Sequence, residues 1–153
     1  MKKSLPQAAD GNEKGQWAEQ FAEHWLKSHG LTPHTQNYTR RLGEIDLVLR
    51  DEPNNTWVFV EVKYRSANAK VSGVESITLA KQRKLHRTAE LFLQQVRDHT
   101  SAARIDVVVI TQRRNKEEAQ GRDLQASMSQ EPGYFQARIG DYELLWIQNA
   151  IAG

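Results

Sequence analysis

The spacing of hydrophobic residues along the chain predicts two helices. Over residues 13–29, apolar side chains recur every three or four positions, as on one face of a helix, and Gly30 ends this stretch. A second helix is expected over residues 76–97, where the apolar stripe consists of Leu85, Ala89, Phe92 and Val96. Lys81 and Gln82 lie one turn before Leu85, so we expect one or both at the edge of the inward face.

Shorter apolar runs, rich in Val and Ile, predict strands. They lie at residues 43–50, 57–65 and 103–110, and a short strand is expected before them at 35–39. Residues 134–139 and 142–151 are expected to close the domain as a strand followed by a strand or a short helix. This order of helix, three antiparallel strands, helix and a further strand predicts an α/β fold, in which a mixed sheet of about four to five strands is flanked by helices.

Length and composition fit one globular domain. The chain has 153 residues, of which 39% are hydrophobic and 26% charged, as in ordinary folded proteins. We expect a flexible lead-in at residues 1–12, a single domain over 13–150 and a mobile polar insertion at about 111–133. There is no cysteine, no signal-like apolar stretch and no window long enough to span a membrane, so a cytoplasmic protein is expected.

Two neighbouring strands carry ionisable residues at positions where burial is expected. Glu44 and Asp46 lie in the first, and Glu61 and Lys63 in the second. Residues 51–56 form a turn by composition. If the hairpin folds about the middle of this turn, residues whose numbers sum to 107 are opposite one another, so Asp46 faces Glu61 and Glu44 faces Lys63. The four polar side chains then share one face of the sheet. The opposite face is apolar and is predicted to contain Ile45, Leu47, Leu49, Val58, Val60 and Val62.

This arrangement predicts a metal site. Asp46 and Glu61 would hold Mg²⁺ or Mn²⁺ through carboxylate oxygens, and the backbone carbonyl of Val62 would add another ligand. Lys63 would orient an attacking water or stabilise charge in the transition state of phosphodiester hydrolysis. Glu19, at the border of the apolar face of the first helix, could supply an outer ligand. The alternative is an ion-paired edge strand with exposed Glu44–Lys63 and Asp46–Arg65 bridges.

Basic residues are concentrated around the predicted site. The formal net charge is only +2, but many of the cations fall in one part of the chain. They are Arg40, Arg41, Arg50, Lys63, Arg65, Lys70, Lys81, Arg83, Lys84 and Arg87. Such a field would attract a polyanion, and Arg41, Arg65 and Lys81 are the candidates for contacts with nucleic acid. An ordinary surface role is the alternative for these three residues.

Two motifs, GEID at residues 43–46 and FVEVK at 59–63, carry a family resemblance. With Gly15 and Glu19 upstream and the RIDVV segment at 104–108, the chain resembles the YraN-like bacterial proteins. That family is similar to archaeal Holliday-junction resolvases and has the restriction-endonuclease-like PD-(D/E)xK fold. The resemblance implies that Asp46, Glu61 and Lys63 are nuclease-type residues and that Glu19 is the acid of the first helix.

The resemblance also sets the functional expectation. It implies a metal-dependent endonuclease acting on DNA, with branched or otherwise structured DNA as one substrate class, and it allows a homodimer. The alternative from a different class is a nucleic-acid-binding or partner-binding protein that keeps the fold without turning over a substrate. A scaffold held by salt-bridged strands is a third reading. Fold resemblance alone does not fix the reaction.

Overall fold

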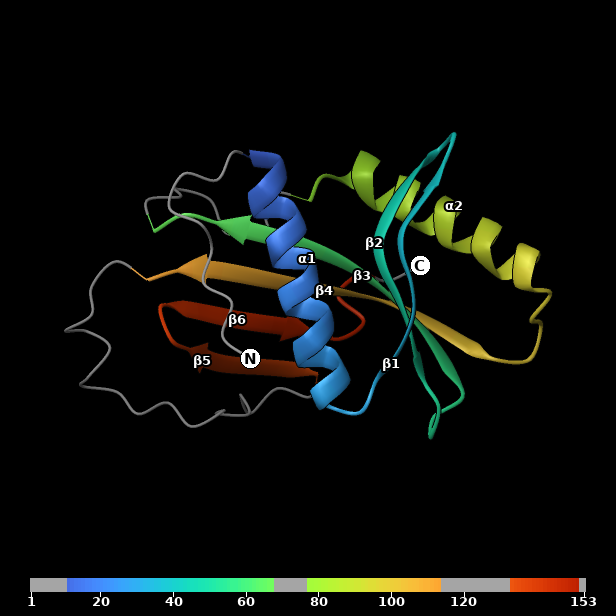
Figure 1. Ribbon diagram of the computed structural model, residues 1–153. Coiled ribbons are helices and arrows are strands. Elements are labelled where there is room, and N and C mark those ends of the chain that lie inside the picture. The colour runs from blue at the N-terminus through green and yellow to red at the C-terminus, as the bar shows by residue number, and fades with distance from the viewer. Residues whose placement is uncertain (1–10, 68–76, 114–132, 152–153) are drawn as a thin grey trace.

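A mixed six-stranded sheet lies between two helices in the computed structural model, which describes residues 11–67, 77–113 and 133–151 (Figure 1). The elements are α1 (Gly11–Ser28), β1 (Thr32–Arg40), β2 (Gly43–Asp51), β3 (Thr56–Arg65), α2 (Leu79–Val96), β4 (Ala102–Gln112), β5 (Tyr134–Ile139) and β6 (Tyr142–Ile147). The predicted α/β class and the order of the first six elements are confirmed. Both closing segments are strands, which brings the sheet to six strands.

The strands follow the order β1-β2-β3-β4-β6-β5 across the sheet. Only β3 and β4 are parallel, because the chain crosses over through α2 between them; the other neighbours are antiparallel. β3 therefore lies inside the sheet, so Glu61 and Lys63 are not on an edge strand. This arrangement of a mixed sheet with helices on both faces is compatible with a restriction-endonuclease-like core.

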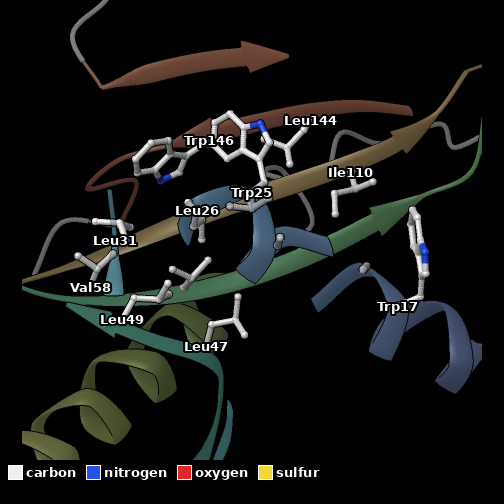
Figure 2. Packing of buried hydrophobic residues seen from close by; sticks show 14 residues of the cluster. Trp17, Trp25, Leu26, Leu31, Leu47, Leu49, Val58, Ile110, Leu144 and Trp146 are labelled. Atoms are coloured by element: carbon white, nitrogen blue, oxygen red, sulfur yellow. The ribbon is translucent and has the colours of Figure 1, made fainter. Parts of the chain in front are cut away.

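The helix α1 packs on one face of the sheet through a large apolar cluster (Figure 2). Trp17, Trp25 and Leu26 of α1 meet side chains from four strands, among them Leu47, Leu49, Val58, Ile110 and Leu144. Leu26 is fully buried, as are the strand residues Leu47, Leu49 and Val58. Burial of each such side chain contributes roughly 1.5–3 kcal/mol, so this cluster fixes α1 against the sheet.

The helix α2 covers the opposite face. Its buried residues Leu85, Ala89 and Phe92 belong to a second cluster that contains Val48, Phe59 and other strand residues. The helix begins after Thr78, whose side chain accepts a hydrogen bond from the Lys81 amide at 3.2 Å. It ends at Arg97, which adopts a left-handed conformation. These caps fix where Lys81 lies relative to the strands.

The predicted register of the β2–β3 hairpin is confirmed. Leu47 pairs with Val60 and Asp51 pairs with Thr56, so the residue numbers of each pair sum to 107. The assignment of Ile45 to the same face as Leu47 and Leu49 was wrong, because Ile45 belongs to the cluster under α2 and the two leucines to the cluster under α1. The partner strand shows the reason: Asn37 has a positive φ of 50°, and the strands change face there. On β1, Gln36 bonds to Glu23 of α1, whereas Tyr38 bonds to Gln95 of α2.

Parts of the sequence predictions fall beyond the described residues. The lead-in expected at 1–12 lies outside them except for its last two residues, which belong to α1. The insertion expected at 111–133 lies mostly outside as well, and its first two residues extend β4. Across the residues described, neither helix has the length and apolar character needed to span a membrane.

Candidate functional site

The candidate site forms where β2 and β3 part. The ladder between these strands runs from Asp51–Thr56 to Leu47–Val60. One residue beyond its end, the side chain of Asp46 turns to the β3 backbone, and Asp46 Oδ2 accepts a hydrogen bond of 2.8 Å from the Val62 amide. The opening between the strands thus contains a carboxylate in place of the next ladder pair.

A cavity of about 220 Å³ opens at this point, between β2, β3 and the first turns of α2. It is lined by Gly43, Glu44, Asp46, Glu61, Lys81, Lys84 and Leu85. The backbone of Gly43 packs closely against α2, since a Cβ at this position would lie only 2.9 Å from Thr88 Oγ1. The lining combines three carboxylates with two lysines, an arrangement suited to a charged ligand.

Glu61 is the most buried carboxylate of the cavity, with only 4% of the residue exposed. One of its oxygens, Oε1, receives two ammonium groups: Lys81 Nζ at 2.8 Å and Lys63 Nζ at 3.2 Å. Lys63 comes from the same strand, two residues further on, whereas Lys81 reaches across from α2. A buried carboxylate requires such partners, because its desolvation is otherwise costly.

Asp46 has a strongly perturbed acidity. Burial raises its pKa to about 8, and the negative charge of Glu61 adds to the effect. The hydrogen bond from the Val62 amide acts in the opposite direction but does not outweigh burial. Ion pairs of the cavity, within the part of the chain that the structure describes, end on Glu61 and not on Asp46. Among the described residues, Asp46 therefore has no directly paired ammonium group, although Lys81 and Lys84 line the same cavity.

A third acid, Glu19 of α1, reaches the same region. Its pKa is raised by burial, although hydrogen bonding with Asp46 opposes the effect. In the amide orientation that its neighbours require, the Asn37 side-chain nitrogen donates to Glu19 Oε2 and to Glu44 Oε1, each at 3.0 Å. Asn37 thus bridges the acid of α1 to the start of β2. Glu44 lies with this group and is not in the ladder opposite Lys63.

The two lysines differ in their electrostatics. Burial lowers the pKa of Lys63, and the neighbouring Lys81 contributes to the same shift. Burial also acts to lower the pKa of Lys81, but its hydrogen bonds with Glu61 and Lys63 and the negative charges of the nearby carboxylates together leave the pKa raised. Lys81 is therefore the more firmly charged of the two, and Lys63 is the one whose proton is held less tightly.

A model of the uncharacterised protein family UPF0102 matches residues 18–110, which run from α1 to β4. The chain belongs to this family. The match includes Glu19, Asp46, Glu61, Lys63 and Lys81, and it confirms the YraN-like resemblance drawn from the GEID and FVEVK motifs.

Several bacterial UPF0102 proteins are similar to this chain over most of their own length. The UPF0102 protein of Aeromonas hydrophila is 43% identical over 97 residues, covering 62% of this chain and 73% of the relative. That of Aliivibrio fischeri strain MJ11 is 40% identical over 114 residues, covering 72% and 85%. That of Photobacterium profundum is 42% identical over 108 residues, covering 69% and 84%.

The remaining predicted residues of this UPF0102 chain lie around the cavity and not inside it. Arg41 is exposed in the turn between β1 and β2. Arg65 ends β3, and its guanidinium donates to the Tyr64 carbonyl at 3.1 Å. Gln82 turns its amide to the Ile77 carbonyl at 3.1 Å, near the beginning of α2. None of these three lines the cavity.

Sequence reasoning gave no individual role in the site to two residues, Lys84 and Asn37, although Lys84 is among the basic residues noted around it. Lys84 lines the cavity three residues after Lys81, so the helical spacing that marked Lys81 could also have identified Lys84. Asn37 was visible only as an Asn inside a strand, where a residue type that tolerates positive φ signals a local irregularity. Across the residues that the structure describes, no three His, Cys, Asp or Glu side chains are grouped closely enough to hold a metal ion. A metal site here would rest on the Asp46 and Glu61 carboxylates together with a backbone oxygen.

Proposed function

We propose that this protein is a metal-dependent endonuclease that hydrolyses phosphodiester bonds in DNA. The observation that carries the proposal is the placement of Asp46 beside Glu61 at the point where β2 and β3 part. Lys63 and Lys81 both pair with Glu61 there. Two carboxylates in one partly buried cavity repel each other unless a proton or a cation separates their charges. The raised pKa of Asp46 is the effect of that repulsion and of burial.

The donor set fits a hard divalent cation. Asp46 and Glu61 offer carboxylate oxygens, the ligands that Mg²⁺ and Mn²⁺ prefer, and the Val62 carbonyl is the third ligand in this proposal. Glu19 forms a hydrogen bond with Asp46 and would support that ligand without binding the ion directly. When bound, such an ion polarises a phosphoryl oxygen and lowers the pKa of a bound water.

The residues of the chain supply the rest of the chemistry. Lys63 Nζ is fixed 3.2 Å from Glu61 Oε1 and remains on the cavity side of β3. From there it would donate a hydrogen bond to the attacking water or to an oxygen on which negative charge develops. Because burial lowers the pKa of Lys63, the loss of a proton from this amine is easier than from an exposed lysine. Either role depends on the ammonium position set by Glu61.

A polyanionic substrate is favoured by the charges at the mouth of the cavity. Lys84 and Arg83 are exposed on α2, and Arg41 is exposed in the β1–β2 turn, whose neighbour Gly43 lines the cavity. The first turn of α2 contains no acidic residue. Phosphate groups would therefore meet positive charge on the approach to Asp46 and Glu61.

The test is divalent-ion-dependent cleavage of a panel of duplex, single-stranded, flapped and four-way-junction DNA. We expect Lys63→Ala to lose at least about 100-fold in cleavage rate, as is usual when a charge-stabilising group is removed. Lys27→Ala, an exposed change in the last turn of α1, is the matched control and should cleave like the wild type. Equal rates in the wild type and Lys63→Ala, with both proteins folded, would refute the proposal.

A second function, binding of nucleic acid without catalysis, is favoured by one observation. Glu61 is already neutralised by two ammonium groups in the protein itself, which satisfies the buried carboxylate without an ion. The same panel separates the two functions. Tight binding of one DNA shape, with no cleavage in Mg²⁺ or Mn²⁺, would support the binding protein over the nuclease.

A further inference from the structure

One oxygen of Glu61 is shared by two lysines that differ in origin and exposure. Lys63 is on the same strand and its side chain is 17% exposed, whereas Lys81 comes from α2 and its side chain is 40% exposed. The contact from Lys81 is nevertheless the shorter, at 2.8 Å against 3.2 Å. Glu61 thus has one cation from its own strand and one that reaches it from α2.

We propose that Lys81 is an exchangeable counter-ion of Glu61, which holds the carboxylate in the free protein and moves to a DNA phosphate when a divalent cation takes its place. This inference rests on the proposed function, because it requires that Asp46 and Glu61 bind a divalent cation. Lys81 is then more than a fixed DNA contact, because its partner changes from Glu61 to a phosphate. In this account Lys81 couples occupation of the cavity to binding of the substrate.

The position of Lys81 in its helix supports a dependence on Glu61. Thr78 caps α2 and Lys81 is three residues later, so its ammonium lies at the end of the helix where the macrodipole disfavours a positive charge. No acidic residue in the first turn of α2 compensates for this charge. Glu61, on the strand beneath, is the compensating group, and removing its charge would leave Lys81 without that compensation.

The Lys81 ammonium can leave Glu61 without any change in the fold. The backbone of Lys81 is fixed by the Thr78 cap, and the apolar residues that attach α2 to the sheet begin at Leu85. Only the flexible side chain has to move, and two-fifths of it is already exposed. Lys63 has less freedom, because only 17% of its side chain is exposed, against 40% for Lys81. Of the two ammonium groups, Lys81 is therefore the one that can leave.

The first experiment measures Mn²⁺ binding to the full chain without DNA, by electron paramagnetic resonance of the free ion. Lys81→Gln removes a competitor for the Glu61 carboxylate, so we expect this variant to bind Mn²⁺ roughly 3- to 10-fold more tightly than the wild type. Lys27→Gln, an exposed change in the last turn of α1 outside the cavity lining, is the control for loss of one charge and should change the affinity less than twofold. Thermal unfolding of each variant verifies that it is folded.

The second experiment measures the salt dependence of DNA binding, with Ca²⁺ as a divalent ion that is expected not to support cleavage. Each phosphate contact adds about 0.9 to the slope of log K against log salt for duplex DNA. We expect Lys81→Gln to lower the slope by about that amount in Ca²⁺ and to leave it unchanged in EDTA. An equal loss in both conditions would make Lys81 a constant DNA contact and overturn the exchange.

The outcomes separate this inference from the proposed function. Mn²⁺ binding by the wild type with an unchanged or weaker affinity in Lys81→Gln would overturn the exchange alone and leave the nuclease proposal standing. No Mn²⁺ binding by the wild type would overturn both. Tighter Mn²⁺ binding in Lys81→Gln, together with a salt-slope difference seen only in Ca²⁺, is the result that supports the exchange.

Discussion

The backbone amide of Val62 donates a hydrogen bond of 2.8 Å to Asp46 Oδ2, across the gap where β2 and β3 separate. The bond stabilises the charged carboxylate, yet the pKa of Asp46 is raised to about 8, because burial and the charge of Glu61 outweigh it. Between about pH 4 and pH 8 the folded protein therefore holds a proton that the unfolded chain has lost. This difference in bound protons lowers the stability of the fold as pH rises through that range.

The stability difference between Asp46→Asn and the wild type should depend on pH. Since the folded-state pKa is raised, Asp46 makes the free energy of unfolding fall as pH rises from about 4 to about 8. The variant keeps an oxygen for the Val62 amide but carries no charge, so we expect it to be more stable than the wild type by on the order of 2 kcal/mol at pH 8. Near pH 4 the difference should vanish. Urea unfolding across this range is the measurement.

Asp98→Asn is the control with the opposite sign. Hydrogen bonds from Ser101, Trp57 and Thr100 lower the pKa of Asp98, so its contribution to stability is present at neutral pH and is lost as pH falls through the acid range. This variant should therefore be less stable than the wild type at pH 7, with a smaller difference at pH 3. If Asp46→Asn showed the same slope as the wild type between pH 5 and 8, the perturbed acidity assigned to Asp46 would be wrong.

Gly43→Ala should loosen the contact between the β1–β2 turn and α2. A Cβ at position 43 would lie 2.9 Å from Thr88 Oγ1 and 3.5 Å from Lys84 Cβ, and Thr88 is fully buried. We expect a loss of about 1–3 kcal/mol in the free energy of unfolding, as for overpacking elsewhere. Gly15→Ala is the matched control, because nothing lies within 4 Å of its Cβ, and in a helix it should stabilise by up to about 1 kcal/mol. Equal effects of the two changes would contradict the close packing.

The sequence predicted the register of the hairpin because the turn between β2 and β3 is symmetrical and the apolar residues alternate. The face of Ile45 could not be predicted in the same way. Strand periodicity assumes regular backbone, and the left-handed conformation of Asn37 on the neighbouring strand interrupts it. Glu44 therefore does not face Lys63 as predicted but is joined to Glu19 through Asn37, while Asp46 lies beside Glu61.

Two other features depended on contacts that the sequence does not encode locally. β1 extends from Thr32 to Arg40, longer than the predicted 35–39. It is an edge strand in which Tyr38 is the only buried residue. Such a strand shows little apolar alternation. The contact of Lys81 with Glu61 joins α2 to β3 over 20 positions of sequence, so spacing could place Lys81 near the inward face but could not identify its partner.

Trp146→Phe should show how strongly a buried carboxylate depends on one donor. Asp106 is fully buried on β4, and Trp146 Nε1 donates to its Oδ2 at 3.0 Å. Arg104 Nε donates to both oxygens of Asp106, and the Asn149 amide donates to Oδ1, so the variant removes one of the two donors to Oδ2. We expect a loss of about 2–4 kcal/mol, combining lost volume with the lost bond. Trp25→Phe, in the same cluster, should cost about 1 kcal/mol less. Equal losses would show that packing alone determines the effect.

Substitutions at Asn37 should separate backbone strain from hydrogen bonding at the edge of the site. The residue has a φ of 50°, which glycine adopts freely and alanine does not, so Asn37→Ala should be less stable than Asn37→Gly by about 1 kcal/mol. Both variants lose the amide that donates to Glu19 and Glu44. Because that hydrogen bond lowers the pKa of Glu19, both should raise this pKa further, as carboxyl titration by NMR would detect. An alanine variant as stable as the glycine variant would show that the left-handed conformation is not required, and an unchanged Glu19 pKa would show that Asn37 does not bridge the two acids.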